Sequence, residues 1–185
     1  MAPRTKFLLM LSFFAAPMLV AWLAYFGWHP DKHKNYGSLL KVTPLIHTQG
    51  SLVDGTPLQF DVLKGKWVMV YVGGASCDVA CQQQLYYMRQ SRLVLGKDQD
   101  RVARVWVLSD TATPDAALLQ AHKGLYVWRP AHPGFVQQFP ATKADAKHLY
   151  VVDPLGNVMM RFPENVDPKG MIKDLKLLLK ASQVG

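Results

Sequence analysis

The only two cysteines among the 185 residues of this chain stand four positions apart, at Cys77 and Cys81, in the stretch VYVGGASCDVACQQQLYYMRQ. A pair with this spacing has three chemical interpretations: a structural disulfide, a reversible redox pair, or a site for a soft metal ion. A disulfide here would close a very short loop, and the chain-entropy stabilisation from a crosslink grows with loop length. The spacing therefore favours redox or metal chemistry over a structural crosslink.

The pair lies where an apolar run passes into a helical pattern. The run WVMVYV, 67–72, predicts a buried strand, and a helix is expected to follow it from Asp78. A thiol at a helix N-terminus meets unpaired N–H groups and the positive end of the helix dipole, and both favour the thiolate. If Cys77 caps this helix and Cys81 lies in its first turns, their Cα atoms are about 6 Å apart, within disulfide range. The pair could then undergo redox cycling or bind Cu(I), which prefers thiolates.

The remaining elements predict how the pair is positioned. A second buried strand is expected at 102–110, a helix at 113–124, a hairpin at 148–162 and a last helix near the C-terminus. The order β, β, α, β, α, hairpin, α predicts an α/β, thioredoxin-like fold, with a central mixed sheet and helices on both faces, over 51–185. In the helix after the cysteines, we expect Val79, Leu85, Met88 and Leu93 to share the buried stripe.

An apolar run near the N-terminus predicts a membrane anchor. The run KFLLMLSFFAAPMLVAWLAYFGW is long enough for a transmembrane helix, which we place at 7–28. Residues 1–6 would then be cytoplasmic and 29–50 a linker that partly packs on the domain. A cleaved signal peptide is the alternative, but its apolar part would be shorter and followed by small residues. The expected location is a bacterial inner membrane, single-pass, with the C-terminal domain in the periplasm, and the small even number of cysteines agrees with an oxidising compartment.

The charge distribution limits the choice of partners. The formal net charge is +8, but the basic residues are scattered through the sequence and do not form one block. A nucleic acid is a poor partner for a membrane-anchored domain with this pattern. We expect a mildly basic, solvated surface near anionic lipid, with a docking face for an acidic partner as the alternative.

Three stretches together resemble the Sco/SenC branch of thioredoxin-like proteins. They are LKGKWVMVYVGGASCDVAC, RVWVLSD and LYVVDPLGNVMMRF, and the resemblance covers roughly residues 50–182. Sco proteins are membrane-anchored factors for cytochrome c oxidase assembly. They use a C-x-x-x-C pair and a distant histidine to carry copper to oxidase subunit II, or to reduce the thiols of its copper site. The resemblance implies copper as a cofactor, and oxidase subunit II or other assembly factors as partners. The chain is also similar to a small transmembrane protein of unassigned role that accompanies oxidase assembly factors in proteobacteria.

The chain departs from the Sco pattern at the site itself. Asp78 and Gln82 stand where a proline follows each cysteine in Sco proteins. Asp145 falls at the position of the Sco histidine, and the nearest histidine, His148, comes three residues later. The resemblance thus gives Cys77, Cys81 and His148 as candidate metal ligands. The simpler interpretation of His148 is a strand-edge histidine with no ligand role.

Three functions remain open after the sequence is read. The first is a copper-relay or thiol-disulfide factor for cytochrome c oxidase assembly, in which Cys77 and Cys81 carry the chemistry. The second is a generic periplasmic dithiol-disulfide oxidoreductase without metal, and the third is a non-catalytic assembly scaffold. The displaced histidine weakens the metal branch of the first function, and the retained cysteine pair weakens the third.

Overall fold

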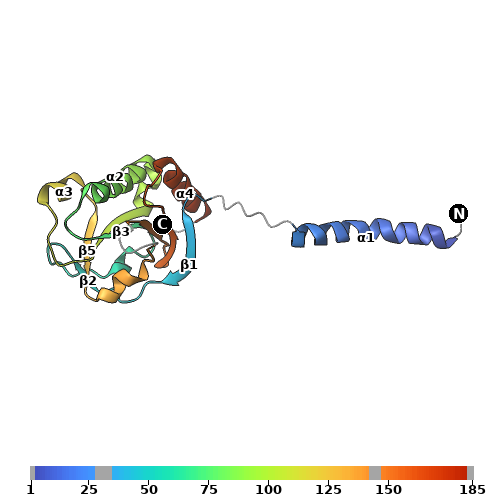
Figure 1. The fold of residues 1–185 in the computed structure, drawn as a ribbon, viewed down its shortest axis with the longest axis horizontal. Coiled ribbons are helices and arrows are strands. Elements are labelled where there is room, and N and C mark those ends of the chain that lie inside the picture. The colour runs from blue at the N-terminus through green and yellow to red at the C-terminus, as the bar shows by residue number, and fades with distance from the viewer. Residues whose placement is uncertain (1–2, 28–34, 142–146, 183–185) are drawn as a thin grey trace. The chain divides into compact units, whose positions relative to one another are not determined.

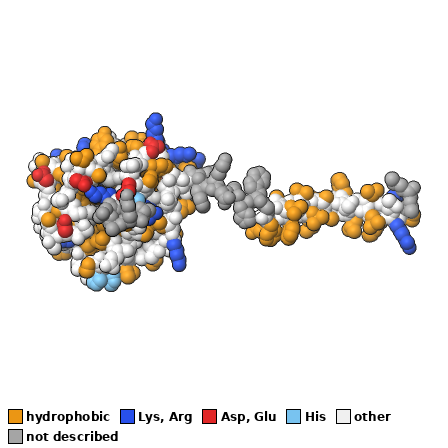
Figure 2. Space-filling view, viewed as in Figure 1, with side chains coloured by type: hydrophobic (Ala, Val, Ile, Leu, Met, Phe, Trp, Pro, Cys, Tyr) orange, Lys and Arg blue, Asp and Glu red, His pale blue; other side chains and the backbone are white. Residues whose placement is uncertain are grey.

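The computed structural model describes residues 3–27, 35–141 and 147–182, in two compact units, Met1–Lys34 and Asn35–Gly185. The first unit holds one helix, α1, Pro3–Gly27, with Pro17 inside it. Residues Pro3–Phe26 are long and apolar enough to cross a membrane, with a mean hydropathy of 2.2 over an 18-residue window. Hydrophobic side chains line this helix along its length (Figure 2). The helix overlaps the predicted span at 7–28, whose last residue lies outside the described part of the chain.

The second unit is built on a seven-stranded mixed sheet with the order β1-β7-β6-β3-β4-β5-β2 (Figure 1). Its strands are β1 Ser38–Pro44, β2 Gly50–Leu52, β3 Trp67–Gly73, β4 Val102–Leu108, β5 Tyr126–Pro130, β6 Leu149–Val152 and β7 Asn157–Arg161. Its α-helices are α2 Val79–Val94, α3 Ala116–Ala121 and α4 Pro168–Ala181, and its 3-10 helices are η1 Phe60–Leu63, η2 Gly96–Arg101 and η3 Pro133–Gln138.

The centre of the sheet is parallel and buried. Strand β3 pairs in parallel with β4, and β4 pairs in parallel with β5. Valine and aromatic side chains dominate β3 and β4, apart from Arg104 in β4, and such apolar runs are typical of strands covered on both faces. Both strands end at the same edge of the sheet, where Gly73 lies opposite Leu108. The loop that carries the cysteines leaves from this edge.

The predicted hairpin is confirmed as β6 and β7, which pair antiparallel beside β3. Asp153 fixes its turn, because the carboxylate accepts hydrogen bonds from the backbone N–H groups of Leu155 and Asn157. Gly156 adopts a positive φ of 92° in this turn, a conformation that glycine tolerates without steric cost.

Two hydrophobic cores lie on opposite faces of the sheet. The α-helices α2 and α4 cover one of them, which we call the helix-side core. It contains Leu85, Met88, Met171 and Leu175 together with Cys81. The 3-10 helices η1 and η3 cover the opposite core, to which they contribute Phe60 and Phe135.

The inner stripe predicted for α2 is partly wrong. Leu85 and Met88 are buried, but Val79 and Leu93 are 83% and 51% exposed. The buried stripe instead includes Gln84, whose side-chain amide donates a hydrogen bond of 2.6 Å to the carbonyl of Glu164.

The predicted linker at 29–50 also needs correction. Strand β1 lies inside that segment and pairs antiparallel with β7 at one edge of the sheet. It is held at its start by Asp174 of α4, whose buried carboxylate accepts a hydrogen bond of 2.7 Å from the N–H of Gly37. The folded unit therefore begins before residue 51.

Candidate dithiol site

Cys77 and Cys81 form a disulfide at the N-terminal end of α2, with their Cα atoms 5.2 Å apart. The two sulfur-bearing residues differ in exposure. Cys77 is half-buried and precedes the helix, whereas Cys81 is only 2% exposed and packs in the helix-side core. The sequence-based expectation that the pair can bridge is confirmed. Any incoming nucleophile or partner thiol would reach Cys77 first.

The N-cap of α2 is Asp78, and not Cys77 as we expected. The carboxylate of Asp78 accepts a hydrogen bond of 2.9 Å from the backbone N–H of Cys81, as N-cap side chains do. The side-chain amide of Gln82 donates a bond of 3.1 Å to the carbonyl of Cys77. The two residues that replace the Sco prolines therefore both hold the backbone around the disulfide.

Lys147 forms an ion pair with the same carboxylate of Asp78. The hydrogen bond from Lys147, followed by that from the N–H of Cys81, holds the pKa of Asp78 below its ordinary value of 3.8. A group with a lowered pKa stabilises the folded state above its unfolded-state pKa, and this contribution is lost as the pH falls through the lowered value. The Asp78 carboxylate therefore stays ionised throughout the neutral and mildly acidic range.

The floor of the site is built from the ends of the two central strands. Both carboxylate oxygens of Asp110, just beyond β4, accept hydrogen bonds from the N–H of Ala75, at 3.2 and 3.0 Å. Gly74 permits this approach, because a Cβ atom there would lie 2.5 Å from Asp110 Oδ2. Beneath the loop, burial and then the charge of Asp78 raise the pKa of the Tyr71 phenol to about 12, so it stays protonated at physiological pH.

An open groove of about 740 Å³ runs in front of Cys77. One wall is the cysteine loop, with Ala75, Ser76 and Gln82, and the other is the segment 112–121 that contains α3. Ala112, Ala117, Leu118 and Ala121 make much of the second wall apolar. A polypeptide segment that carries a cysteine could lie in this groove beside Cys77.

His148 lies on the other side of the sheet from the cysteines. In β6, Leu149 and Val151 belong to the helix-side core, whereas Tyr150 and Val152 belong to the opposite core. The ring of His148 lies beside that of Tyr150, with centroids 6.2 Å apart, and therefore follows the same alternation. Its Nδ1 is 2.8 Å from the carbonyl oxygen of Phe162, and the residue is 4% exposed.

The described residues do not bring the three candidate ligands together. Within 3–27, 35–141 and 147–182, no three His, Cys, Asp or Glu side chains gather as a metal site would require. Asp145, which aligned with the Sco histidine, lies outside these ranges. The role of His148 as a ligand remains a prediction.

Sequence reasoning missed two residues of the site. Asp110 carried a usable signal, because it follows a strand parallel to β3 and such strands end at the same sheet edge. Lys147 carried no signal, since nothing in the sequence pairs it with a residue 69 positions earlier.

The sheet order, with a cysteine pair at the start of the helix that follows the central strand, defines a thioredoxin-like dithiol domain. The chain belongs to the family described as transmembrane-like, thioredoxin-like, C-terminal domain, whose profile matches residues 67–182. No curated protein sequence matches the chain.

Solved structures share the same fold. The copper-bound ScoI of Arabidopsis thaliana is 15% identical, with a TM-score of 0.58 over 80% of this chain and 99% of that one. BsSco, a member of the Sco family of cytochrome c oxidase assembly proteins, is 14% identical, with a TM-score of 0.55 over 80% of this chain and 96% of that one. The thioredoxin domain of a thiol-disulfide oxidoreductase from Bacteroides vulgatus is 16% identical, with a TM-score of 0.54 over 77% and 98%. The predicted thioredoxin-like fold is thereby confirmed, and Sco proteins are among the structures that share it.

The charge next to Cys77 offers a direct test of the site. We expect Asp78→Asn to speed alkylation of Cys77 in the reduced protein at neutral pH. Asparagine can still cap the helix, but it removes a negative charge that disfavours the thiolate, while Lys147 remains. Lys147→Gln should slow the reaction. Rate constants for iodoacetamide labelling, followed by peptide mass spectrometry, give the comparison, and equal rates in all three proteins would exclude electrostatic control by this ion pair.

Proposed function

We propose that this chain is a membrane-anchored, periplasmic thiol-disulfide factor for the assembly of cytochrome c oxidase. The observation that carries the proposal is the disulfide between a half-buried Cys77 at an open groove and a buried Cys81. This asymmetry suits a nucleophile that attacks a partner and a second thiol that releases it. The oxidase as the target rests on the Sco-like fold, since BsSco belongs to a family of oxidase assembly proteins.

The reaction begins with the reduced pair. The Cys77 thiolate attacks one sulfur of a partner disulfide, forms a mixed disulfide and expels the other partner sulfur as a thiolate. The Cys81 thiolate then attacks the Cys77 sulfur, which closes the Cys77–Cys81 disulfide and releases the second partner thiolate. Two electrons pass to the partner, and a dithiol reductant must reduce the pair again before another cycle.

The fold assists the first step at Cys77. Cys77 precedes the 16-residue helix α2, so that its thiolate faces the positive end of the helix dipole. The Asp78 carboxylate accepts a hydrogen bond from the N–H of Cys81 and places a negative charge beside the thiol of Cys77. The ion pair with Lys147 offsets that charge. The reactivity of Cys77 is therefore set by the balance of these three groups.

Copper transfer is a second candidate, with Cu(I) as cargo. It is favoured by the copper-bound state of the similar ScoI structure. The donor chemistry fits in part, because two thiolates suit Cu(I), while the imidazole of His148 lies beside Tyr150, a residue of the opposite core. Cys77 and Cys81 would hold the ion only while both are reduced, because thiolates, and not disulfide sulfurs, are the ligands that suit Cu(I).

Two other functions are separated from this proposal by simple observations. A generic dithiol-disulfide oxidoreductase, suggested by the similar domain from Bacteroides vulgatus, would reduce many disulfides without preference for the oxidase. A non-catalytic scaffold would support oxidase assembly after both cysteines had been replaced. The direct assay mixes the reduced full-length protein in detergent with the oxidised copper-site domain of oxidase subunit II. The thiols that appear on that domain are then counted by alkylation and mass spectrometry, since the exchange leaves the total number of thiols unchanged.

The membrane topology is testable by itself. We propose that α1 anchors the chain in the inner membrane and that residues 29–185 face the periplasm. A reporter enzyme that is active only in the periplasm should therefore be active when fused after Gly185. A fusion at the same position to a reporter that is active only in the cytoplasm should remain inactive. The opposite result would remove the oxidising compartment on which the redox proposal depends.

A further inference from the structure

A second polar site lies at the C-terminal half of α2, and it shares Ala121 with the cysteine groove. We call it the basic pocket, and its volume is about 480 Å³. Its lining residues are Arg89, Arg92, Leu93, Arg104, Gln120, Ala121 and Lys123. Four of the seven carry a positive charge, and none carries a negative one.

Arg104 is the unusual member of the basic pocket. It lies in the middle of strand β4, whose residues are all buried, and it is 3% exposed. Its Nη2 donates a hydrogen bond of 2.7 Å to the carbonyl of Lys123, but its Nε and Nη1 have no partner among the described residues. Buried charges are normally paired, because an unpaired one loses its hydration without compensation.

The charges that act on Arg104 are those of two neighbouring arginines. Burial, followed by the charges of Arg92 and Arg89, lowers the pKa of Arg104 to about 10. The guanidinium remains charged at neutral pH, yet the nearby charges repel it. The acidic residue Asp100 pairs with Arg92 at 3.0 Å, but its side chain is 84% exposed.

The flanking arginines are held in place by the backbone. Arg89 donates to the carbonyl of Ala121 at 2.9 Å, and Arg92 donates from Nε to the carbonyl of Val102 at 2.8 Å. These bonds fix the two side chains beside the pocket. Each guanidinium has five N–H groups, so N–H donors remain that could bind an anion. Because these side chains are already held in place, little side-chain entropy is lost when an anion binds.

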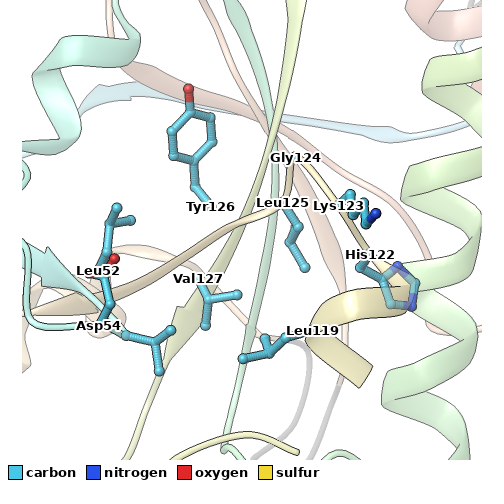
Figure 3. A pocket seen from close by; sticks show the side chains of 10 residues that line it. Leu52, Asp54, Leu119, His122, Lys123, Gly124, Leu125, Tyr126 and Val127 are labelled. Atoms are coloured by element: carbon cyan, nitrogen blue, oxygen red, sulfur yellow. The ribbon is translucent and has the colours of Figure 1, made fainter. Parts of the chain in front are cut away.

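His122 adds a second unpartnered group next to the cluster. It is buried, and its Nδ1 has no hydrogen-bond partner in the part of the chain that the structure describes. Burial, followed by the charges of Arg104 and Arg89, lowers its pKa. Figure 3 shows its ring at the edge of the neighbouring pocket, beside the end of α3. Its neutral imidazole adds no positive charge, so the attraction for an anion comes from the arginines and Lys123.

We propose that the basic pocket binds a phosphate-type oxyanion, with Arg104 as its central ligand and Arg89, Arg92 and Lys123 around it. Guanidinium groups match the planar and bidentate geometry of phosphate oxygens, and an anion would supply both the missing counter-charge and the missing acceptors. A free phosphate group and the headgroup of an anionic phospholipid share this chemistry. The site is separate from the cysteine pair and does not depend on the proposed redox function.

The test uses the full chain in a non-ionic detergent and inorganic phosphate as the probe. Phosphate should raise the melting temperature of the wild type saturably above that in chloride of equal ionic strength. Arg104→Met should lose this shift and should melt in chloride at or above the wild-type temperature, because the unpaired buried charge is gone. A purely structural arginine would instead give a less stable variant. Arg161→Met, which removes one arginine outside the pocket, should keep the phosphate shift.

A second variant and a second probe complete the experiment. Arg89→Gln, on the exposed face of α2, should weaken phosphate binding roughly tenfold, the equivalent of one charge-assisted hydrogen bond. If Arg104→Met does not fold, this variant decides the result. Full chain in nanodiscs with and without phosphatidylglycerol tests the lipid source: an Arg89-dependent stabilisation by that lipid assigns the headgroup, and stabilisation by free phosphate alone assigns a soluble ligand. No stabilisation by either, or an equal phosphate shift in the pocket variants and the wild type, overturns the proposal.

Discussion

Cys77→Ser is expected to abolish disulfide exchange with an oxidised partner, whereas Cys81→Ser is expected to stop the exchange at a mixed disulfide. Cys77 faces the open groove, so only its thiolate can attack an incoming disulfide. Cys81 is buried and acts only on the Cys77 sulfur. Non-reducing electrophoresis and mass spectrometry of the trapped adduct measure both outcomes, with exchange by Cys77→Ser at the background rate.

Two controls keep this result interpretable. Thr43→Ala changes an exposed residue of β1, outside the groove, and should leave exchange unchanged. Cys81→Ala repeats the trap without placing a hydroxyl in the helix-side core, which guards against a variant that fails to fold. An adduct on Cys81 in the Cys77→Ser protein would reverse the assigned roles of the two thiols.

The elements that carry the site could be predicted because their signals are local. The run 67–72 has the valine-rich, apolar character of a buried strand, and it forms β3. The hairpin at 148–162 carries its turn residues within the segment DPLGN. Helix geometry predicts a Cα distance of about 6 Å between the cysteines. The observed separation of 5.2 Å lies near this value, although Cys77 precedes the N-cap of the helix.

The errors arose where a distant partner decides the outcome. Gln84 is buried because its amide reaches the carbonyl of Glu164, 80 residues later, and this rotates the inner face of α2 away from Val79 and Leu93. Strand β1 was missed because most of its residues are exposed at the sheet edge, so it lacks the alternation of a half-buried strand.

The site itself was only partly readable for the same reason. Asp78 looked like a departure from the Sco pattern, and only the structure shows it as a helix cap that is paired with Lys147.

The basic pocket was also only partly predictable from the sequence. Arg104 lies inside the apolar run RVARVWVL, and a charged residue in a run that predicts a buried strand is unusual enough to suggest a special role. The role of Arg104 in an anion site depends on Arg89 and Arg92, and the sequence does not show that the packing of α2 on β4 brings these residues near it.

Cu(I) binding by the reduced protein is expected to require both cysteines and to survive the loss of His148. The soft thiolates of Cys77 and Cys81 are the ligands that suit Cu(I), so Cys77→Ser or Cys81→Ser should each lose stoichiometric binding. His148 lies beside Tyr150 in the opposite core, and His148→Gln should retain most of the affinity. Titration of the full chain against a coloured Cu(I) chelator of moderate strength gives the measurement.

The interpretation of this titration depends on the comparison among variants. His132→Gln replaces a histidine in the turn before η3 and should bind Cu(I) like the wild type. If His148→Gln loses Cu(I) as fully as the cysteine variants while its circular dichroism spectrum is unchanged, reduction must bring His148 to the pair, and the site is a three-ligand Sco-type site. If the wild type itself gives up Cu(I) to the chelator, copper is not its cargo. The disulfide exchange at Cys77 would then be the chemistry that the asymmetric pair performs.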